Sequence, residues 1–412
     1  MINFRMLKLS DMQVWFSVGA LIIISLLAIL STTYGMQARA GLDPFIYLKR
    51  QLVSLLIASG GLVLFLYFDY IHLKKVSIFF YAFMLLILGV VLFSGSSAMG
   101  AQRWIMLGPF SFQPSEISKL IMIIVLAGYL SSREKINNFI DAIPLLALAA
   151  VPFLLIFKQP DLGTALVFIA ILIGMLAAAD ASPKLLILMV TPFLSVLFRP
   201  ILALWIVYLL VIVVALFLTR ASFTDWLLIL GLNVAVGIAV PFMWGMLKSY
   251  QRMRIIAFLN PAADPYGAGY HSMQSLIAIG SGGLFGKGFM HGSQTQLQFI
   301  PEQHSDFIFS AIGEEWGFFG AAIVVILFAM LVFRALAVAA EARDPFGRLL
   351  ASGIAVMITF HVLANIGMAL GILPVVGIPL PLMSFGGSSL IMLLCSVGIL
   401  QSIAMRRQKL IF

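Results

Sequence analysis

Long runs of apolar residues alternate with short polar segments along most of this sequence. Twelve such runs approach the ~20 residues that an α-helix needs to cross a bilayer. They cover residues 14–33, 47–68, 76–94, 114–131, 140–157, 161–179, 184–198, 200–218, 224–247, 306–333, 349–372 and 385–404. No run shows the two-residue alternation of a membrane β-barrel, so we expect an all-α, polytopic transmembrane bundle of about 10–12 helices.

Two features interrupt this pattern. The runs 184–198 and 200–218 are separated only by Arg199, with Pro200 opening the second, which fits either a tight hairpin or one long broken segment. Residues 248–305 form a long stretch that is polar, glycine-rich and charged. We therefore expect a single membrane domain, residues 1–412, with 248–305 as one large external loop between a helix that ends near 247 and a helix that starts near 306.

The composition excludes a soluble globular protein. Hydrophobic residues make up 62% of the chain and charged residues 10%, whereas charged residues are about 25% of a typical soluble domain. The formal net charge is +9, but the basic residues lie in short segments between apolar runs, as expected for membrane loops. This placement argues against nucleic-acid binding.

The distribution of cations predicts an orientation. With the N-terminus in the cytoplasm, the positive-inside rule places both termini and most loop cations on the cytoplasmic side. These cations are Lys74, Lys75, Arg133, Lys135, Lys184, Arg220, Arg334, Arg343, Arg348, Arg406, Arg407 and Lys409. The external face receives Arg39, Lys49, Arg50, Arg103, Lys158, Arg199, Lys248, Arg252, Arg254 and Lys287. Either the function requires cations outside, or the topology is inverted.

Glu116 and Lys119 lie within the fourth apolar run, where a charge at the bilayer centre costs at least ~2.5 kcal/mol. Their i, i+3 spacing places them on one helix face, where pairing reduces the desolvation cost. Two interpretations stay open. The pair either pins its helix structurally or lines a substrate cavity.

Acidic residues begin the run that follows the external loop. Asp306 and Glu314 are eight residues apart and return to one helix face, with Glu315 beside them. They predict an acidic stripe that descends from the external surface. Asp306 also fits a carboxylate that faces the positive end of a helix dipole, and Asp161, after Pro160, fits the same role.

The loop contains a glycine-rich segment, GSGGLFGKG, around Lys287. It is not a nucleotide-binding P-loop, because Ser281 stands where the first glycine is required and Gly288 where Ser or Thr should follow the lysine. Successive backbone N–H groups near Lys287 can form a cradle for an anionic head group. The alternative is a flexible loop or close helix packing, which glycine also permits.

Three longer motifs carry a resemblance to a known family. They are DPYGAGYHSMQSLIAIGSGGLFGKG, SQTQLQFIPEQHSDFIFSAIGEEWG and GIPLPLMSFGGSS. Together with RWIMLGPFSFQPSEISKL and KQPDLGTA, they are similar to the SEDS family of bacterial envelope proteins (shape, elongation, division and sporulation). The resemblance covers essentially the whole chain and is strongest toward the rod-elongation branch.

The resemblance implies a peptidoglycan glycosyltransferase that polymerises lipid II on the outer face of the bacterial cytoplasmic (inner) membrane. The catalytic acidic residue of such proteins is the aspartate of the D-P-x-G-x-G-Y motif, here Asp264. Further functional positions fall on Arg103, Trp104, Glu116, Lys119, Asp161, and the segment Glu302, His304 and Asp306. Two departures are Ser305, where threonine is usual, and the stretch 184–220, which is longer than a ten-helix plan requires.

The residue types fit this chemistry. The reaction joins the C4 hydroxyl of one disaccharide to the anomeric carbon of another, and a positioned carboxylate such as Asp264 accelerates such a step by about 10²- to 10⁴-fold as a general base. The undecaprenyl pyrophosphate that leaves requires fixed cations. Arg103, Lys119, Arg252, Arg254 and Lys287 are available. A divalent cation, Mg²⁺ or Mn²⁺, bridging Asp264 or another carboxylate to the phosphates is chemically reasonable, and no organic cofactor is expected.

Other functions and partners stay open at this point. A lipid II flippase or another transporter of lipid-linked substrates would use Glu116, Lys119 and the acidic stripe as a translocation path. A scaffold that only recruits another synthase is a further alternative. The resemblance also implies a class B penicillin-binding protein of the elongation type as partner, with other membrane proteins of the elongation machinery as further candidates.

Overall fold

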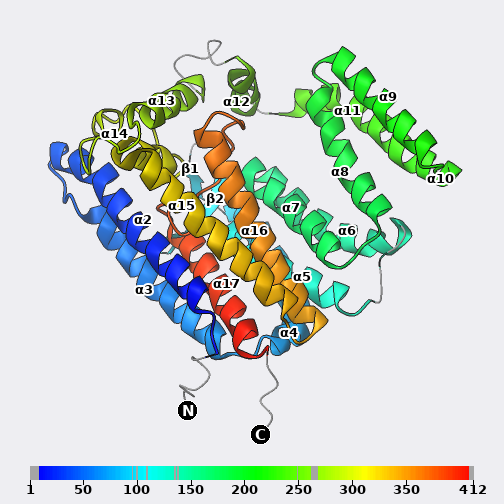
Figure 1. The fold of residues 1–412 in the computed structure, drawn as a ribbon, viewed down its shortest axis with the longest axis horizontal. Coiled ribbons are helices and arrows are strands. Elements are labelled where there is room, and N and C mark those ends of the chain that lie inside the picture. The colour runs from blue at the N-terminus through cyan, green and yellow to red at the C-terminus, as the bar shows by residue number, and fades with distance from the viewer. Residues whose placement is uncertain are drawn as a thin grey trace, which may run out of the picture.

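The computed structural model describes residues 9–94, 96–98, 101–107, 110–133, 136, 139–247, 249–260 and 268–407. They form a bundle of long helices (Figure 1). The first helix begins and the last helix ends at the same end of the bundle, where Asp11 and Gln401 are joined by two hydrogen bonds of 2.8 Å. We call this the terminal end. The loop end is the opposite one, where the described residues between 249 and 305 lie.

Helical segments match all of the predicted apolar runs, so the expected all-α membrane bundle is confirmed. They are α2 (Met12–Arg39), α3 (Ile46–Tyr67), α4 (Ile71–Ser94), α5 (Pro114–Leu130), α6 (Phe139–Lys158), α7 (Leu162–Ala178), α8 (Pro183–Phe198), α9 (Leu202–Leu218), α10 (Phe223–Asp225) with η1 (Trp226–Leu230) and α11 (Gly231–Met246), α15 (Ile308–Ala340), α16 (Pro345–Ala369) and α17 (Gly387–Met405). Among the described residues, 8 helices are long and apolar enough to cross a membrane, and α7, α8 and α9 are shorter apolar helices. The chain is a polytopic membrane protein.

Several helices extend beyond the predicted bounds because their polar first or last turns lie outside the apolar runs. Helix α16 begins at Pro345 rather than 349. The Asp344 carboxylate caps it by accepting a hydrogen bond of 3.0 Å from the Gly347 N–H, and proline favours the first helical position. Helix α2 likewise continues to Arg39. The apolar pattern therefore locates helices better than it locates their ends.

Residues 184–218 form a tight hairpin and not one broken segment. Helices α8 and α9 run antiparallel, since Tyr208 donates to the Thr191 carbonyl at 2.9 Å and Trp205 donates to Ser195 at 3.3 Å. The buried side chain of Asn233, on α11, joins this contact by accepting from Ser195 at 2.8 Å. Hydrogen bonds between buried polar side chains hold membrane helices together, so α8, α9 and α11 form one polar-centred unit at the side of the bundle (Figure 1).

A small antiparallel sheet between α4 and α5 was not predicted. Its strands are β1 (Ser96–Ala98), β2 (Ala101–Leu107) and β3 (Phe110–Phe112), in the order β1-β2-β3. Ile105 is the register partner of Phe112, and Trp104 is the partner of Ser96. The sheet carries two predicted site residues, Arg103 and Trp104, at the loop end.

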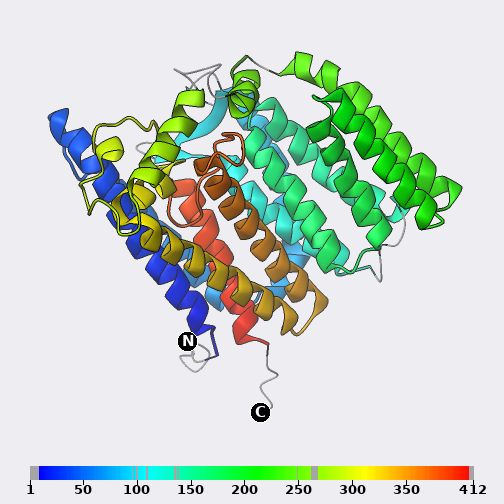
Figure 2. The same ribbon diagram turned by 45° about the horizontal axis from the view of Figure 1, so that its top comes forward.

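Within its described residues, 249–260 and 268–305, the predicted external loop contains three helices of its own. They are α12 (Ser249–Leu259), α13 (Ala268–Ser281) and α14 (Ser293–Gln296). Helix α13 packs on the beginning of α15 and approaches α16. Figure 2 shows these helices beside the segment that joins α16 to α17. The stretch is therefore a partly helical cover for the loop end.

Four of the cations predicted to share one face of the membrane form ion pairs at the terminal end, and Lys135 and Lys409 lie outside the described residues. Arg334 pairs with Asp11, Arg348 with Asp180 at 3.2 Å, Arg406 with Asp69 at 3.8 Å, and Arg407 with Glu341. Each pair joins residues that are far apart in the sequence. These pairs fix the terminal ends of α2, α7, α15, α16 and α17 relative to one another.

Candidate functional site

Strand β2 is fastened to the turn between α6 and α7 at the loop end. The half-buried Arg103 donates to the Gln159 carbonyl at 3.1 Å and to the Pro160 carbonyl. Both partners are neutral, so these contacts orient the guanidinium without neutralising its charge. Trp104 is the next residue along β2 and is also half-buried.

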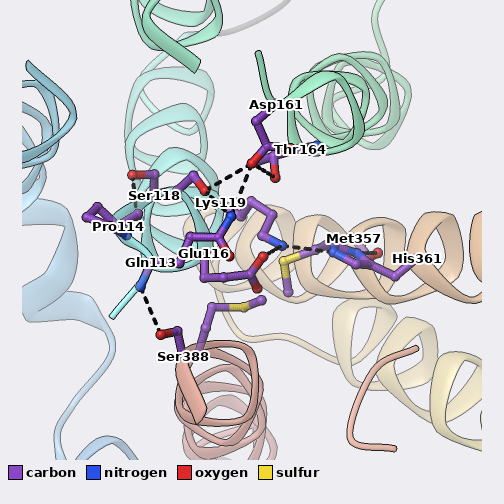
Figure 3. A network of polar contacts seen from close by, with 12 residues as sticks. Gln113, Pro114, Glu116, Ser118, Lys119, Asp161, Thr164, Met357, His361 and Ser388 are labelled. Atoms are coloured by element: carbon purple, nitrogen blue, oxygen red, sulfur yellow. Dashed lines mark hydrogen bonds and ion pairs between the residues drawn. The ribbon is translucent and has the colours of Figure 1, made fainter. Parts of the chain in front are cut away.

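Asp161 is buried and caps α7, as the helix-start interpretation predicted. Its Oδ1 accepts from the Thr164 N–H at 3.2 Å and its Oδ2 from the Thr164 hydroxyl at 3.0 Å. The same Oδ2 accepts from Gln113 at 3.1 Å. Gln113 precedes α5, so this carboxylate joins the beginnings of α5 and α7 (Figure 3).

Glu116 and Lys119 form a buried ion pair on α5. The Lys119 Nζ lies 2.8 Å from Glu116 Oε1, and the two side chains are 1% and 5% exposed. Lys119 also lies 2.9 Å from His361 Nε2 on α16, as Figure 3 shows. This burial favours the structural pair over direct lining of an open cavity.

The second contact of His361 fixes its tautomer. Its Nδ1 lies 2.8 Å from the Met357 carbonyl, and a carbonyl oxygen only accepts. Nδ1 therefore carries the ring proton, and Nε2 accepts a hydrogen bond from the Lys119 ammonium. His361 is thus the neutral third member of a buried group that spans α5 and α16.

Asp306 lies just before α15, beside a cation from α12. A Cβ atom at Gly377 would lie 3.5 Å from Asp306 Oδ2 and 3.9 Å from Arg254 Nη1, so both groups approach the same side of this glycine. Burial raises the pKa of Asp306 to about 6, and the charge of Glu302 adds to this effect, whereas Arg254 and Arg103 oppose it. These influences place Asp306 within a cluster of charges from several elements.

Glu302 and His304 lie on the same segment as Asp306. Glu302 is exposed and adopts a left-handed backbone conformation, with φ 50°, which a non-glycine residue adopts at a cost of about 1–3 kcal/mol. The His304 ring packs edge-on against Tyr47, with ring centroids 4.9 Å apart. Burial lowers the pKa of His304, and nearby Glu302 partly opposes this.

Lys287 is paired within the protein. Its Nζ lies 2.8 Å from Glu314 Oε1 and 2.7 Å from the Ser293 hydroxyl. Glu314 is fully buried and also accepts from the Thr295 N–H at 2.8 Å. Glu315 accepts from the Ser31 hydroxyl at 2.5 Å. The predicted acidic stripe is therefore turned inward, onto partners from α14 and α2.

The glycine-rich segment docks on a break in α15 at Gly317, where φ is 65°. Lys287 and Gly288 donate backbone hydrogen bonds of 3.0 Å to the carbonyls of Glu314 and Glu315. In the other direction, Phe318 donates to the Gly283 carbonyl at 2.9 Å. These contacts use the N–H groups at Lys287 and Gly288, and they favour close packing over an anion cradle.

The docking predicts a sharp difference between two nearby glycines. A Cβ at Gly282 would lie 2.0 Å from the Gly313 carbonyl oxygen, whereas a Cβ at Gly280 meets nothing within 4 Å. We expect Gly282→Ala to lower the free energy of unfolding by at least ~2 kcal/mol. The matched Gly280→Ala should be neutral or slightly stabilising because alanine favours helix. Thermal unfolding in detergent measures both, and equal stability of the two variants would contradict this packing.

The remaining predicted positions are Arg252, Asp264 and Lys248. Arg252, on α12, donates to the Gly245 carbonyl at 2.6 Å. Asp264 and Lys248 lie outside the described residues. Arg103, Asp161, Arg254, Glu302 and Asp306 thus gather at the loop end, while Glu116 and Lys119 lie buried on α5 and Lys287 is held against α15.

Comparison with known proteins identifies the family. The model of the FtsW/RodA/SpoVE family, described as cell cycle proteins, matches residues 11–207 and 182–409. The chain belongs to this family. The SEDS resemblance seen in the sequence is thereby confirmed. The two matched segments overlap at 182–207, at the α8–α9 hairpin.

Relatives of this SEDS protein carry names from both branches of the family. Peptidoglycan glycosyltransferase MrdB of Escherichia coli (strain K12) is 39% identical over 77% of this chain and 74% of its own length. Peptidoglycan glycosyltransferase RodA of Treponema pallidum is 35% identical over 87% of this chain and 90% of its own. A probable peptidoglycan glycosyltransferase FtsW of Geobacter sp. (strain M18) is 36% identical over 93% and 96%.

Solved structures share the fold of this SEDS protein. A chain from a peptidoglycan synthase complex, studied for its coordination of polymerization and crosslinking, aligns with a TM-score of 0.72 and 30% identity, over 97% of this chain and 98% of that one. The rod shape determining protein RodA of Thermus thermophilus aligns with a TM-score of 0.64 and 27% identity, over 97% and 98%.

Sequence reasoning missed two residues of this SEDS protein's site. His361 lies in the predicted run 349–372, so the search for ionisable groups within membrane spans could have found it. Asn365 is fully buried one helical turn further along α16, and its side chain contacts the Asp306 carbonyl. Buried amides in apolar runs carry the same signal, although more weakly than charges do.

Proposed function

We infer that this protein is a peptidoglycan glycosyltransferase of the RodA type, which polymerises lipid II during cell elongation. The observation that carries the inference is the charge cluster at the loop end, in a chain that belongs to the SEDS family over nearly its whole length. The cluster combines the carboxylates of Asp306 and Asp161 with the cations of Arg254 and Arg103. Relatives over most of the chain are named peptidoglycan glycosyltransferases.

The general base in this proposal is Asp264. A sugar hydroxyl is a weak nucleophile, and a carboxylate that removes its proton lowers the barrier. The flanks of Asp264 are α12, which presents Arg254 to the cluster, and α13, which packs on α15. A base on this connection would act beside the cations that receive the leaving group. Residues 248–305 then serve as the catalytic loop of a single transmembrane domain.

The leaving pyrophosphate is assigned to the arginines of the loop end. Arg103 and Arg252 donate to carbonyl oxygens, which carry no net charge, so their positive charges are available to phosphate oxygens. Lys287 and Lys119 already face the carboxylates of Glu314 and Glu116. The two lysines therefore support the site from within, and the arginines contact the substrate.

A divalent cation fits the oxygen donors of the site. Among the described residues no three His, Cys, Asp or Glu side chains form a cluster that could hold a metal ion. Mg²⁺ is commonly held by one or two carboxylates together with substrate phosphates, and Asp306 with Asp264 could supply these carboxylates. The ion would neutralise charge on the departing pyrophosphate.

The membrane setting follows from the substrate. Lipid II is anchored by its lipid tail, so it must reach the loop end sideways from the bilayer. We place the loop end on the extracytoplasmic face of the cytoplasmic membrane and both termini in the cytoplasm, in agreement with the positive-inside rule. The proposed partner is a class B penicillin-binding protein, which would crosslink the strands. The likeness to a chain of a peptidoglycan synthase complex supports this.

Glycan synthesis by the purified protein tests the proposal. The full chain, alone and with its crosslinking partner, is incubated with lipid II in detergent, and the products are separated by length. We expect glycan strands. Detergent abolishes the two sides of the membrane, so a flippase or a pure scaffold would give no strands, and that result would overturn the assignment.

The pH dependence of strand synthesis should report Asp306. Its pKa is raised to about 6, so the carboxylate is protonated below this pH and ionised above it. The ionised form is the one that binds a cation or orients the Arg254 guanidinium, so the rate should rise through about pH 6. Asp306→Asn should remove this rise and leave a lower, flatter profile between about pH 5 and pH 8. An unchanged rise in the variant would assign it to another group.

A further inference from the structure

Asn365 holds two segments of the loop end together through one atom. Its Nδ2 donates to the Asp306 carbonyl at 2.8 Å and to the Ile378 carbonyl at 2.8 Å. The side chain is fully buried. Both partners are acceptors, so the nitrogen and not the oxygen must face them. An amide is the neutral group of this size that offers two hydrogens from one atom.

The segment before α15 is attached along three successive carbonyls. The His304 carbonyl accepts a hydrogen bond of 2.9 Å from the Phe385 N–H. The Ser305 carbonyl accepts one of 2.6 Å from the Ser384 hydroxyl. The Asp306 carbonyl accepts from Asn365, as described above. Ser384 and Phe385 belong to the connection between α16 and α17. Asn365 is the member that lies within a regular helix, so it ties both connections to a rigid support.

The position of this contact matters for the charge cluster. The Asp306 side chain comes within 3.5 Å of where a Cβ of Gly377 would be, and Gly377 precedes Ile378. Asn365 thus binds the backbone on both sides of this close approach. Arg254 reaches the same point. One buried nitrogen therefore joins the two backbone segments on which the Asp306 carboxylate and Gly377 lie, next to the Arg254 guanidinium.

We propose that Asn365 is a positioning residue of the active site, which sets the place of the Asp306 carboxylate beside Arg254 by joining Asp306 to the Gly377–Ile378 segment. The proposal rests on the glycosyltransferase function and adds a residue to it. Asn365 contacts two backbone carbonyls and does not contact the reacting atoms. Its effect passes through Asp306, and misplacing a functional group by about 1 Å can reduce a rate about 100-fold.

The chain offers a matched control for a purely structural role. Asn233, on α11, is also fully buried in a helix, and its Nδ2 donates to the Ile229 carbonyl at 2.7 Å and to the Thr191 hydroxyl at 2.9 Å. It lies in the α8–α9–α11 unit, away from the charge cluster. Asn233→Ala therefore removes two comparable donated hydrogen bonds, together with those that its Oδ1 accepts from Ser195 and Tyr208, without altering the site.

The experiment compares Asn365→Ala, Asn365→Asp and Asn233→Ala in the full-length protein. Asn365→Asp keeps the size of the side chain but turns acceptor atoms toward two carbonyls, so it breaks the clamp without leaving a cavity. For each variant we would measure thermal unfolding, the rate of strand synthesis from lipid II at several pH values, and hydrogen exchange of backbone amides in residues 302–307 and 376–386.

The expected result has three parts. Both Asn365 variants should lose roughly 10- to 100-fold in rate, while Asn233→Ala stays within about twofold of the parent. Exchange should rise in the two clamped segments only in the Asn365 variants. The pH at which the rate of strand synthesis rises, near 6 in the parent, should also change, because Asp306 would shift relative to the charges that face it. Those charges are Glu302, Arg254, Asp161 and Arg103.

Other outcomes overturn the proposal. Asn365 is only structural if Asn365→Ala and Asn233→Ala lose stability and rate in parallel while the rate still rises at the parental pH. If hydrogen exchange rises while the rate and its pH dependence stay at parental values, the two hydrogen bonds of Asn365 hold the segments together but do not position the site. If the parent makes no strands while exchange still rises in the Asn365 variants, the glycosyltransferase assignment fails and the positioning role fails with it, although the clamp itself stands.

Discussion

Replacing Asp264 by alanine is expected to abolish strand synthesis, with a loss of about 10²- to 10⁴-fold, the range that a general base contributes. The variant should unfold at nearly the parental temperature, because the substitution removes one polar group and no apolar side chain from the segment between α12 and α13. Lipid II supplied in detergent removes any need for transport. The measurement is the amount and length of glycan made by equal amounts of folded protein.

An asparagine at the same position separates chemistry from backbone structure. Asp264 precedes Pro265, and aspartate before proline commonly begins a turn, which asparagine also supports. Asp264→Asn should therefore keep the turn and still be inactive, since the amide neither accepts the proton nor binds a cation strongly. Strand synthesis near the parental rate in Asp264→Asn would reduce the aspartate to a turn former.

Breaking the buried ion pair on α5 should produce the largest loss of stability. Glu116→Gln leaves the Lys119 ammonium, which is 1% exposed, without a counter-ion, facing only the neutral amide of the variant and the neutral His361. Removal of one partner from a buried pair typically costs about 3–5 kcal/mol. We expect a correspondingly large drop in the unfolding temperature and in the yield of folded protein, measured by size-exclusion chromatography in detergent.

A double variant shows whether the pair does more than stabilise. Replacing both partners by apolar residues, as in Glu116→Leu with Lys119→Met, removes both charges and their desolvation cost, and such exchanges are often neutral or stabilising. If the pair is structural, the double variant should recover both stability and strand synthesis. Recovered stability without strand synthesis would instead give the pair a direct part in catalysis.

The membrane helices were predictable because a bilayer imposes one length on every span. Each apolar run matched a helix, including 184–198 and 200–218, where the sequence left a hairpin and a broken segment as equal possibilities. The polar contacts of Thr191 and Ser195 with the opposite helices decide for the hairpin. The strands 101–107 and 110–112 were not predicted, because apolar runs this short next to a membrane helix cannot be told from an ordinary loop by their sequence pattern.

The site was predictable in its residues more than in its contacts. Motifs identified Arg103, Asp161 and Asp306, the charge of the external loop singled out Arg254, and the structure brings these together. Lys287 illustrates what a local pattern cannot contain. Its charge and glycine neighbours suggested an anion cradle, but its partner Glu314 is 27 residues away in the sequence. Long-range pairing of this kind decides whether a lysine meets a substrate or a neighbouring helix.

The break of α15 at Gly317 changes where the hydrocarbon layer can lie. Helix α15 has 33 residues, which at 1.5 Å per residue is about 50 Å, far longer than the ~30 Å core of a bilayer. The part after the break, residues 318–340, is about 34 Å long by the same rule and fills that thickness alone. The turns that bear Glu314 and Glu315 then lie at the level of the lipid head groups, so the Glu314–Lys287 ion pair and the hydrogen-bonded Glu315 side chain stay outside the hydrocarbon.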